Sequence, residues 1–229
     1  MKNLAIIPAR GGSKRIPRKN IRNFLGKPII AYSIETALES GLFEEVMVST
    51  DDDEIAEVAI KYGAKVPFMR SKENADDHAT LSDVIEEVKE SYISYGKNFE
   101  HICCILPTSP LLNISVLEDG YTFLKKHNAD SVKPVVRFSY PIQRALKIID
   151  EGKVEMIWPE NARVRSQDLE SAYYDAGQFY WMKFTEGLVG TDKYAIEISE
   201  LECQDIDTIE DWRMAELKFK LRENNDFHE

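Results

Sequence analysis

The sequence is poor in the features from which disulfide-rich scaffolds and membrane helices are built. Its 229 residues include three cysteines, two of them adjacent (Cys103 and Cys104), which fit neither a disulfide framework nor a metal-binding spacing. No apolar run reaches the roughly 18 residues that a membrane-spanning helix needs, and no signal-type segment opens the chain. We therefore expect a cytoplasmic protein that contacts no membrane.

The chain also has fewer basic than acidic residues. The chain has 29 lysine and arginine residues against 40 aspartates and glutamates, which gives a formal net charge of −11. Such a surface repels a phosphate backbone, so nucleic acid is not an expected partner. One stretch, residues 10–22, reverses this balance and is termed the basic loop. It holds no acid and six basic residues, namely Arg10, Lys14, Arg15, Arg18, Lys19 and Arg22.

The basic loop directly follows a short apolar run, Leu4–Ile7, of the kind found in a buried central strand. It contains two adjacent glycines, Gly11 and Gly12. Because glycine lacks a Cβ, backbone N–H groups there can approach an anion, and the neighbouring arginines and lysines can neutralise its oxygens. The pattern predicts a polyphosphate-binding loop, although an ordinary solvated basic loop has the same composition.

Neither of the two commonest phosphate-binding motifs is present. The chain has no Gly-x-x-x-x-Gly-Lys-Ser/Thr and no Gly-x-Gly-x-x-Gly. A P-loop kinase is therefore excluded, and a dinucleotide-dependent enzyme is not expected.

The segment Pro8–Asn20, with the sequence PARGGSKRIPRKN, closely resembles the N-terminal signature of the cytidylyltransferases that activate acidic nine-carbon sugars. The resemblance extends from Leu4 to Trp212. It implies an enzyme that transfers CMP from CTP to the anomeric hydroxyl of a nonulosonic acid and releases pyrophosphate, with catalytic roles for Arg10 and Lys19. The nucleotide-binding residues that it implies are Ala9, Arg10, Gly11, Gly12, Ser13, Lys14, Asn20, Arg70, Pro107, Thr108 and Ser109.

A second matching segment, Pro107–Pro110, follows a strand pattern at 101–106. Ligands in open α/β sheets bind outside the carboxyl ends of the strands, and the resemblance places this segment at the nucleotide and the sugar. Leu106 stands where sialic-acid synthetases typically have glutamine, and Leu112 stands where they typically have arginine. Enzymes for the eight-carbon sugar Kdo usually carry an acid near here, and this chain has none. These departures speak against sialic acid and Kdo as acceptors.

The segment Tyr173–Trp181, YYDAGQFYW, resembles the pseudaminic acid branch of the family rather than the Asn-Gly-Ala-Ile-Tyr of sialic-acid synthetases. An aromatic-rich strand that enters the core would explain Phe179 and Trp181. It would not explain Asp175 and Gln178, so we expect these two, with Tyr174, to bind the acceptor. Pseudaminic acid is therefore the expected acceptor. Sialic or legionaminic acid remains an alternative, as does a non-catalytic nucleotide-sensing protein on the same fold.

Asp205 and Asp207 alternate about Ile206, so an extended chain places both carboxylates on one face. Two hard oxygen ligands that face the same way suit Mg²⁺. Asp207 and Glu210 also form a capping pattern for a terminal helix, and both interpretations can hold together. The resemblance implies that Asp205 and Asp207 bind Mg²⁺ and that Asp207 is catalytic.

Three aspartates at 51–53, followed by Glu54, precede a helical pattern at 55–62. This acidic turn, residues 51–54, invites a metal-binding interpretation. We favour helix capping, because carboxylates at a helix start satisfy its free N–H groups and complement its dipole. No metal is assigned to it.

The alternation of strand and helix patterns predicts an α/β fold, a single Rossmann-like three-layer α/β/α domain over residues 1–229 with a mostly parallel central sheet. The predicted strands cover 4–7, 46–49, 63–68, 101–106 and 130–137. The predicted helices cover 29–38, 55–62, 81–95, 114–127 and 209–221. The polar end of the chain, 223–229, is expected to fray.

Residues 138–173, termed the arm, break this alternation. They show short strand patterns at 145–149 and 154–158 and no long helix. The resemblance implies an inserted dimerisation arm that reaches the active site of the partner, and therefore a homodimer. Three polar residues of the arm, Arg144, Arg165 and Gln167, are candidate contacts for the sugar.

Overall fold

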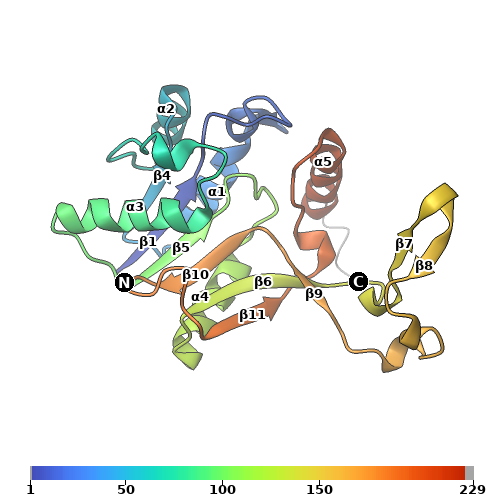
Figure 1. Ribbon diagram of the computed structural model, residues 1–229. Helices are drawn as coiled ribbons and strands as arrows, with labels where there is room; N and C mark the ends of the chain where they lie inside the picture. The colour runs from blue at the N-terminus through green and yellow to red at the C-terminus, as the bar shows by residue number, and fades with distance from the viewer. Residues whose placement is uncertain (1, 225–229) are drawn as a thin grey trace.

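The computed structural model describes residues 2–224 and places a mixed sheet at its centre (Figure 1). Within these residues seven strands form the central sheet, in the order β11-β6-β10-β5-β1-β4 with β9 beside β6. The strands are β1 (Asn3–Pro8), β4 (Glu45–Ser49), β5 (His101–Ile105), β6 (Ser131–Arg137), β9 (Tyr173–Asp175), β10 (Phe179–Lys183) and β11 (Lys193–Glu197). Strand β10 is antiparallel to both neighbours, and β9 is antiparallel to β6. The others share one direction, which confirms the mostly parallel sheet.

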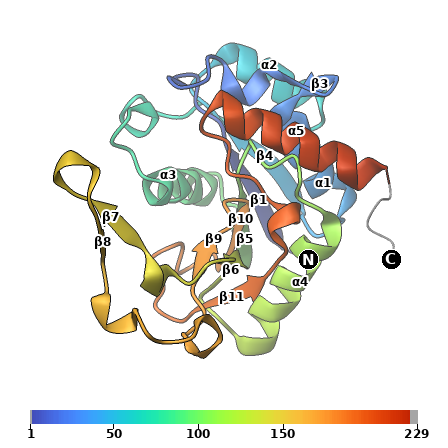
Figure 2. The same ribbon diagram turned by 90° about the vertical axis from the view of Figure 1, so that its right-hand side faces the viewer.

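Helices cover both faces of the sheet, as Figure 2 shows with the sheet between α3 and α4. The helices are α1 (Ile29–Glu39), α2 (Asp53–Lys61), α3 (Leu81–Ser94), α4 (Ile114–His127) and α5 (Ile209–Glu223). Alternate residues of β1 face opposite layers: Leu4 and Ile6 pack in the cluster that contains α3, whereas Ala5 and Ile7 pack with α1, α2 and α4. The three-layer α/β/α fold is confirmed. None of the helices in residues 2–224 has the length and hydrophobicity to cross a bilayer.

Four details of the sequence prediction need correction. The predicted strand at 63–68 is wrong, since the structure shows an isolated bridge between Met47 and Lys65. Pro67 has no N–H to donate, and the chain turns away so that the Arg70 N–H donates to the Thr50 carbonyl at 2.8 Å. The segment Tyr173–Trp181 is not one aromatic-rich strand. It is divided into β9 and β10 around Gly177, whose φ is +63°. Strand β11 was not predicted. Helix α5 continues to Glu223, and the remainder of the expected frayed end, 225–229, lies outside the described residues.

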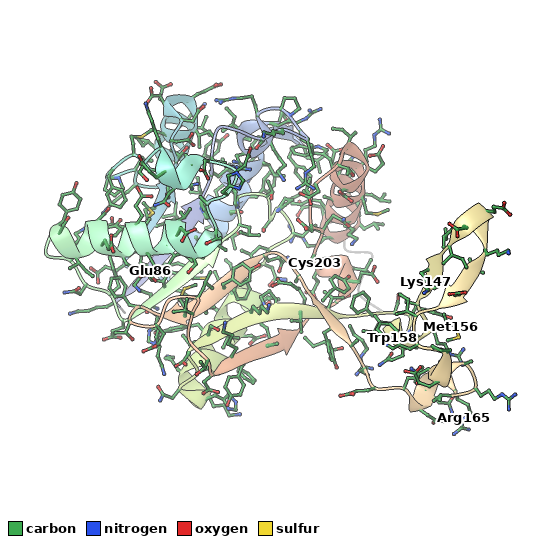
Figure 3. All side chains as sticks on the ribbon, viewed as in Figure 1. Glu86, Lys147, Met156, Trp158, Arg165 and Cys203 are labelled. Carbon is green, nitrogen blue, oxygen red and sulfur yellow. The ribbon has the colours of Figure 1, made fainter. Side chains whose placement is uncertain are left out.

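The arm projects from the body of the molecule (Figure 1). Its hairpin pairs β7 (Leu146–Ile148) with β8 (Val154–Met156), in the positions where short strands were predicted. The hairpin exposes apolar side chains, including Ile148 at 78%. In Figure 3 the side chains labelled Lys147, Met156 and Trp158 lie on this projection, to the right of the central sheet.

A buried carboxylate supports the edge of the sheet away from the arm. Glu45, on β4, accepts hydrogen bonds from the Tyr92 hydroxyl at 2.5 Å, Lys97 Nζ at 2.8 Å and Lys65 Nζ at 2.9 Å. Burial alone would raise the pKa of Glu45, but these bonds outweigh it and lower the pKa to about 2. The ionised form is therefore favoured in the folded protein.

Glu45→Gln is expected to lower the free energy of unfolding by about 2–3 kcal/mol at pH 7. Because the folded pKa lies below the unfolded value, the carboxylate stabilises the protein above about pH 4.5, and this contribution is lost as pH falls towards 2. Urea titrations at pH 7, 4 and 3 check this. The difference between wild type and variant should shrink with acid; a constant difference would contradict the charged network.

Candidate active site

A cavity of about 510 Å³ opens at the carboxyl ends of β1 and β5. These strands are parallel neighbours, so the loops that follow them leave the sheet at the same edge. Nine of the predicted site residues line the cavity, namely Arg10, Ser13, Lys14, Lys19, Asn20, Arg70, Pro107, Thr108 and Asp205. The structure therefore brings the basic loop, the Pro107–Pro110 segment and the Asp205 segment together, although they are far apart in the sequence.

Local contacts hold the basic loop in a fixed form. The Asn20 amide is buried and donates from Nδ2 to the Arg10 carbonyl at 2.9 Å, which closes the loop across its ten residues. Lys19 begins a short 3₁₀ turn, η1 (Lys19–Ile21), that directs its side chain towards the segment of Asp205. The Lys19 ammonium donates to the Ile206 carbonyl at 2.6 Å.

The two aspartates before α5 lie against basic side chains. Arg15 Nη2 is 2.7 Å from Asp207 Oδ1, and Lys19 Nζ is 3.6 Å from the same oxygen. Ile206 between the aspartates is fully buried. Burial raises the pKa of Asp205, and the negative charge of Asp207 raises it further. Asp205 lines the basic cavity, whereas Asp207 is not among the lining residues and lies beside it, paired with Arg15 and Lys19.

Arg70 is a buried cation in the wall of the cavity. Its Nε donates to the Ser49 hydroxyl at 3.0 Å, and its Nη2 donates to the Ser49 carbonyl at 2.6 Å. Burial lowers the pKa of the guanidinium from its ordinary value. These bonds hold the planar group against the end of β4, so an anion or a polar base would meet it in a fixed orientation.

Acidic residues near the start of α3 were missed as site residues. Asp77 is 3.2 Å from Arg10 Nη1 and also pairs with Lys14, and its neighbour Asp76 accepts from Arg10 through the backbone carbonyl at 2.7 Å. The hydrogen bond from Lys14 is the main reason that the pKa of Asp77 lies below its ordinary value. Sequence spacing carries no signal for this contact, because the partners are more than 60 residues apart. A polyphosphate in the cavity would compete with Asp77 for both cations.

Several predicted residues lie outside the cavity lining. Ala9 is buried, the Gly11 N–H donates to Asp51 Oδ1 at 3.0 Å, and Ser109 is buried beside the Gly177 carbonyl. Gly12 is not among the lining residues. The structure does not bring these four residues to the cavity surface.

The predicted acceptor contacts are also absent from the cavity lining, although Gly177, between Asp175 and Gln178, lies next to Asp205. Gln178 is 2% exposed and donates to the Glu202 carbonyl at 2.6 Å, and Asp175 pairs with Lys133 at 2.9 Å. Tyr174 lies on β9 beside β6. The arm residues remain remote: Arg144 donates to the Val164 carbonyl, and Arg165 pairs with Asp168 at 2.7 Å and projects outward in Figure 3. Gln167 lies in the same part of the arm.

A mostly parallel α/β sheet, with a basic loop after its first strand and an Asp-x-Asp segment at the same cavity, defines an α/β nucleotidyltransferase. Residues 4–223 match the family model described as cytidylyltransferase, so the chain belongs to the cytidylyltransferase family.

Individual relatives agree with this assignment. The chain is 44% identical to a pseudaminic acid cytidylyltransferase of Campylobacter jejuni over 235 aligned positions, which cover 99% of this chain and all of the relative. It is 34% identical to a CMP-N,N'-diacetyllegionaminic acid synthase of Legionella pneumophila, over 97% of this chain and 98% of that protein.

Among solved structures, a CMP:2-keto-3-deoxy-manno-octonic acid synthetase complexed with CTP superposes with a TM-score of 0.70. The match covers 98% of this chain and all of that one, at 16% identity. At this identity the likeness establishes the fold and supports the predicted Rossmann-like arrangement.

Proposed function

We propose that this protein transfers CMP from CTP to a nonulosonic acid, with pseudaminic acid as the acceptor, and releases pyrophosphate. The observation that carries the proposal is the 44% identity to a pseudaminic acid cytidylyltransferase along 99% of this chain. The cavity supports it, since its basic side chains suit a triphosphate. We also propose that the reaction takes place in the cytoplasm, where CTP is synthesised.

In the proposed reaction the anomeric hydroxyl oxygen of the sugar bonds to the α-phosphorus of CTP. The bond from that phosphorus to the bridging oxygen breaks, pyrophosphate leaves, and the hydroxyl proton passes to water or to a carboxylate. No protein nucleophile is required, so the rate depends on positioning and charge neutralisation. Arg10 and Lys14 would hold the β- and γ-phosphates, and Lys19 would balance the charge on the departing pyrophosphate.

The carboxylates of Asp205 and Asp207 fit Mg²⁺. The charge of Asp207 contributes to the raised pKa of Asp205, so the two groups repel each other, and a divalent cation held by these carboxylates would relieve that repulsion. In the described part of the chain no three acidic, histidine or cysteine side chains form a complete metal cage. Mg²⁺ usually takes its remaining ligands from water and substrate phosphates. When bound, it would polarise the α-phosphate as a Lewis acid.

Two leucines support pseudaminic acid over sialic acid as the proposed acceptor. Leu106 lines the cavity, and Leu112 is buried in the core at 3% exposure. The resemblance gives sialic-acid synthetases a glutamine and an arginine at these positions, so this chain departs from them at one residue of the cavity lining and one residue of the core. Legionaminic acid is the second candidate, because of the 34% identity to the Legionella pneumophila synthase.

We further propose that the protein is a homodimer joined through the arm. Three apolar side chains of the hairpin, Leu146, Ile148 and Val154, are at least 58% exposed, which is costly for an isolated projection. A partner that covers them would also bring Arg144, Arg165 and Gln167 near a cavity. Light scattering tests this: Ile148→Asp should convert a dimer to a monomer, and a monomeric wild type would refute the proposal.

The experiment that tests the function is pyrophosphate release with CTP and Mg²⁺. Pseudaminic, legionaminic, N-acetylneuraminic and Kdo acids are supplied in parallel. Turnover with pseudaminic acid at the highest kcat/KM supports the proposal. Preference for another of the acids would retain cytidyl transfer and refute the acceptor, whereas no release with any of them would refute the transfer itself.

A further inference from the structure

The acidic turn after β4 lies directly against the basic loop after β1. Strands β1 and β4 are parallel neighbours in which Pro8 is opposite Ser49, so both connections leave the sheet at one edge. Asp52 serves as the N-cap of α2, as the sequence predicted, and accepts from the Ile55 N–H at 3.0 Å. Its carboxylate has a second partner in the basic loop, and that contact is not explained by helix capping.

The second partner is Arg18, which meets Asp52 in a two-pronged contact. Arg18 Nη1 lies 2.5 Å from Asp52 Oδ2, and Nη2 lies 2.9 Å from Oδ1, while Nη2 also bonds to Glu54. The backbone of Arg18 has φ 54° and ψ 32°, a left-handed conformation that a residue with a Cβ adopts reluctantly. The bidentate pair therefore holds the loop in a turn that its own sequence does not favour.

The glycine turn of the basic loop packs against Asp51 and Asp52. The Gly11 N–H donates to Asp51 Oδ1 at 3.0 Å. A Cβ built on Gly11 would lie 2.7 Å from Asp52 Oδ2, so any other residue there would displace the carboxylate. Asp51, Asp52 and Arg18 are not among the residues that line the cavity. Any influence they have on a bound ligand must pass through the loop.

We propose that Arg18 and Asp52 are positioning residues that clamp the basic loop from outside, so that its cavity-lining cations meet the triphosphate of CTP. The argument is geometric. The left-handed turn at Arg18 directly precedes Lys19, whose side chain reaches the Ile206 carbonyl at 2.6 Å. On the other side, the Asp52 carboxylate sets how closely the turn at Gly11 approaches α2. The ligand assignment rests on the proposed function, whereas the clamp itself can be tested without it.

The first test measures the loop in the ligand-free protein. Arg18→Met removes the guanidinium, and Asp52→Asn removes the charge but keeps a good N-cap for α2. Hydrogen–deuterium exchange of peptides covering 9–22 should be at least fivefold faster in both variants. The matched control is Lys27→Met, which breaks the Lys27–Glu35 pair, another partly exposed ion pair that is outside the loop. Unchanged exchange in Arg18→Met, or an equal change in Lys27→Met, would overturn the clamp.

The second test measures the consequence for CTP. Arg18→Met should raise the KM for CTP about tenfold and leave the KM of the acceptor within twofold, because only the phosphate side of the site is displaced. The double variant with Asp52→Asn should be no worse than the poorer single variant, since both changes break one contact. Arg18→Lys should recover only part of the affinity for CTP that Arg18→Met loses, because lysine offers a single point of charge in place of a two-pronged contact.

Equal rises in both KM values, or additive losses in the double variant, would overturn the positioning role. If wild type shows no turnover with any acid, the proposed function fails, and the exchange data alone decide whether the clamp exists.

Discussion

Asp207→Ala is expected to lower turnover by about 10³-fold and to leave the fold intact. The side chain is 36% exposed and is bonded to Arg15 and Lys19, so its removal leaves no large void in the core. It does not cap α5: Thr208 is the N-cap, and Asp211 completes the capping box. The substitution should therefore lower turnover rather than stability, because Asp207 is one of two carboxylates proposed to hold Mg²⁺ beside the α-phosphate.

The matched control for Asp207→Ala is Asp211→Ala, four residues further on. Asp211 Oδ2 accepts from the Thr208 N–H at 2.8 Å and from the Asp207 N–H at 3.1 Å, so this variant loses the capping box, one backbone contact of Asp207 and about 1 kcal/mol of stability, but keeps the Asp207 carboxylate. It should retain turnover within about threefold. Pyrophosphate release with saturating Mg²⁺, together with thermal unfolding of both variants, separates the two effects. Normal turnover in Asp207→Ala would exclude the metal assignment, and equal losses in both variants would indicate a structural role.

Much of the framework could be predicted because it depends on short-range pattern. The apolar runs that became β1, β4 and β5 have five or six residues and are buried almost throughout, so the sequence marks them without ambiguity. Helices α3 and α4 are preceded by Thr80 and Asn113, which are typical N-cap residues. Strand β11 carries no such signal, since its side chains alternate between exposed and half-buried at the edge of the sheet. The segment 63–68 has the composition of a strand and only one bridging partner.

Those parts of the site that lie within one short segment of the sequence could be predicted. The basic loop and the Asp205–Asp207 segment could each be identified alone, and the cavity brings them together. The roles of Asp77 and Asp52 could not be predicted, because each depends on a cation supplied by a remote segment: Lys14 for the first and Arg18 for the second. Local spacing favoured helix capping for Asp52, which is correct and incomplete. The pairing of Arg18 with Asp52 follows from the topology of the sheet, which local sequence patterns do not reveal.

Lys19→Ala is expected to lower kcat/KM by about 10²- to 10³-fold, the usual effect of removing one positioned donor from a charged transition state. The Lys19 side chain is 20% exposed and lies between the basic loop and residues 205–207. Its ammonium donates to the Ile206 carbonyl and is 3.6 Å from Asp207 Oδ1. Its loss removes a positive charge beside the leaving pyrophosphate. It also removes one of the contacts between the basic loop and residues 205–207, while the Arg15–Asp207 pair remains.

Lys126→Ala is the control for this prediction, because Lys126 lies on the exposed face of α4 and takes no part in the cavity. It should change kcat/KM less than twofold, so equal losses in the two variants would mean that the basic loop is ordinary surface. Lys19→Arg separates charge from geometry. The guanidinium keeps the charge but is planar and bulkier than an ammonium, so it cannot bond to Ile206 in the same way. A kcat/KM midway between wild type and Lys19→Ala would show that charge and position both contribute, whereas full recovery would show that charge alone is required.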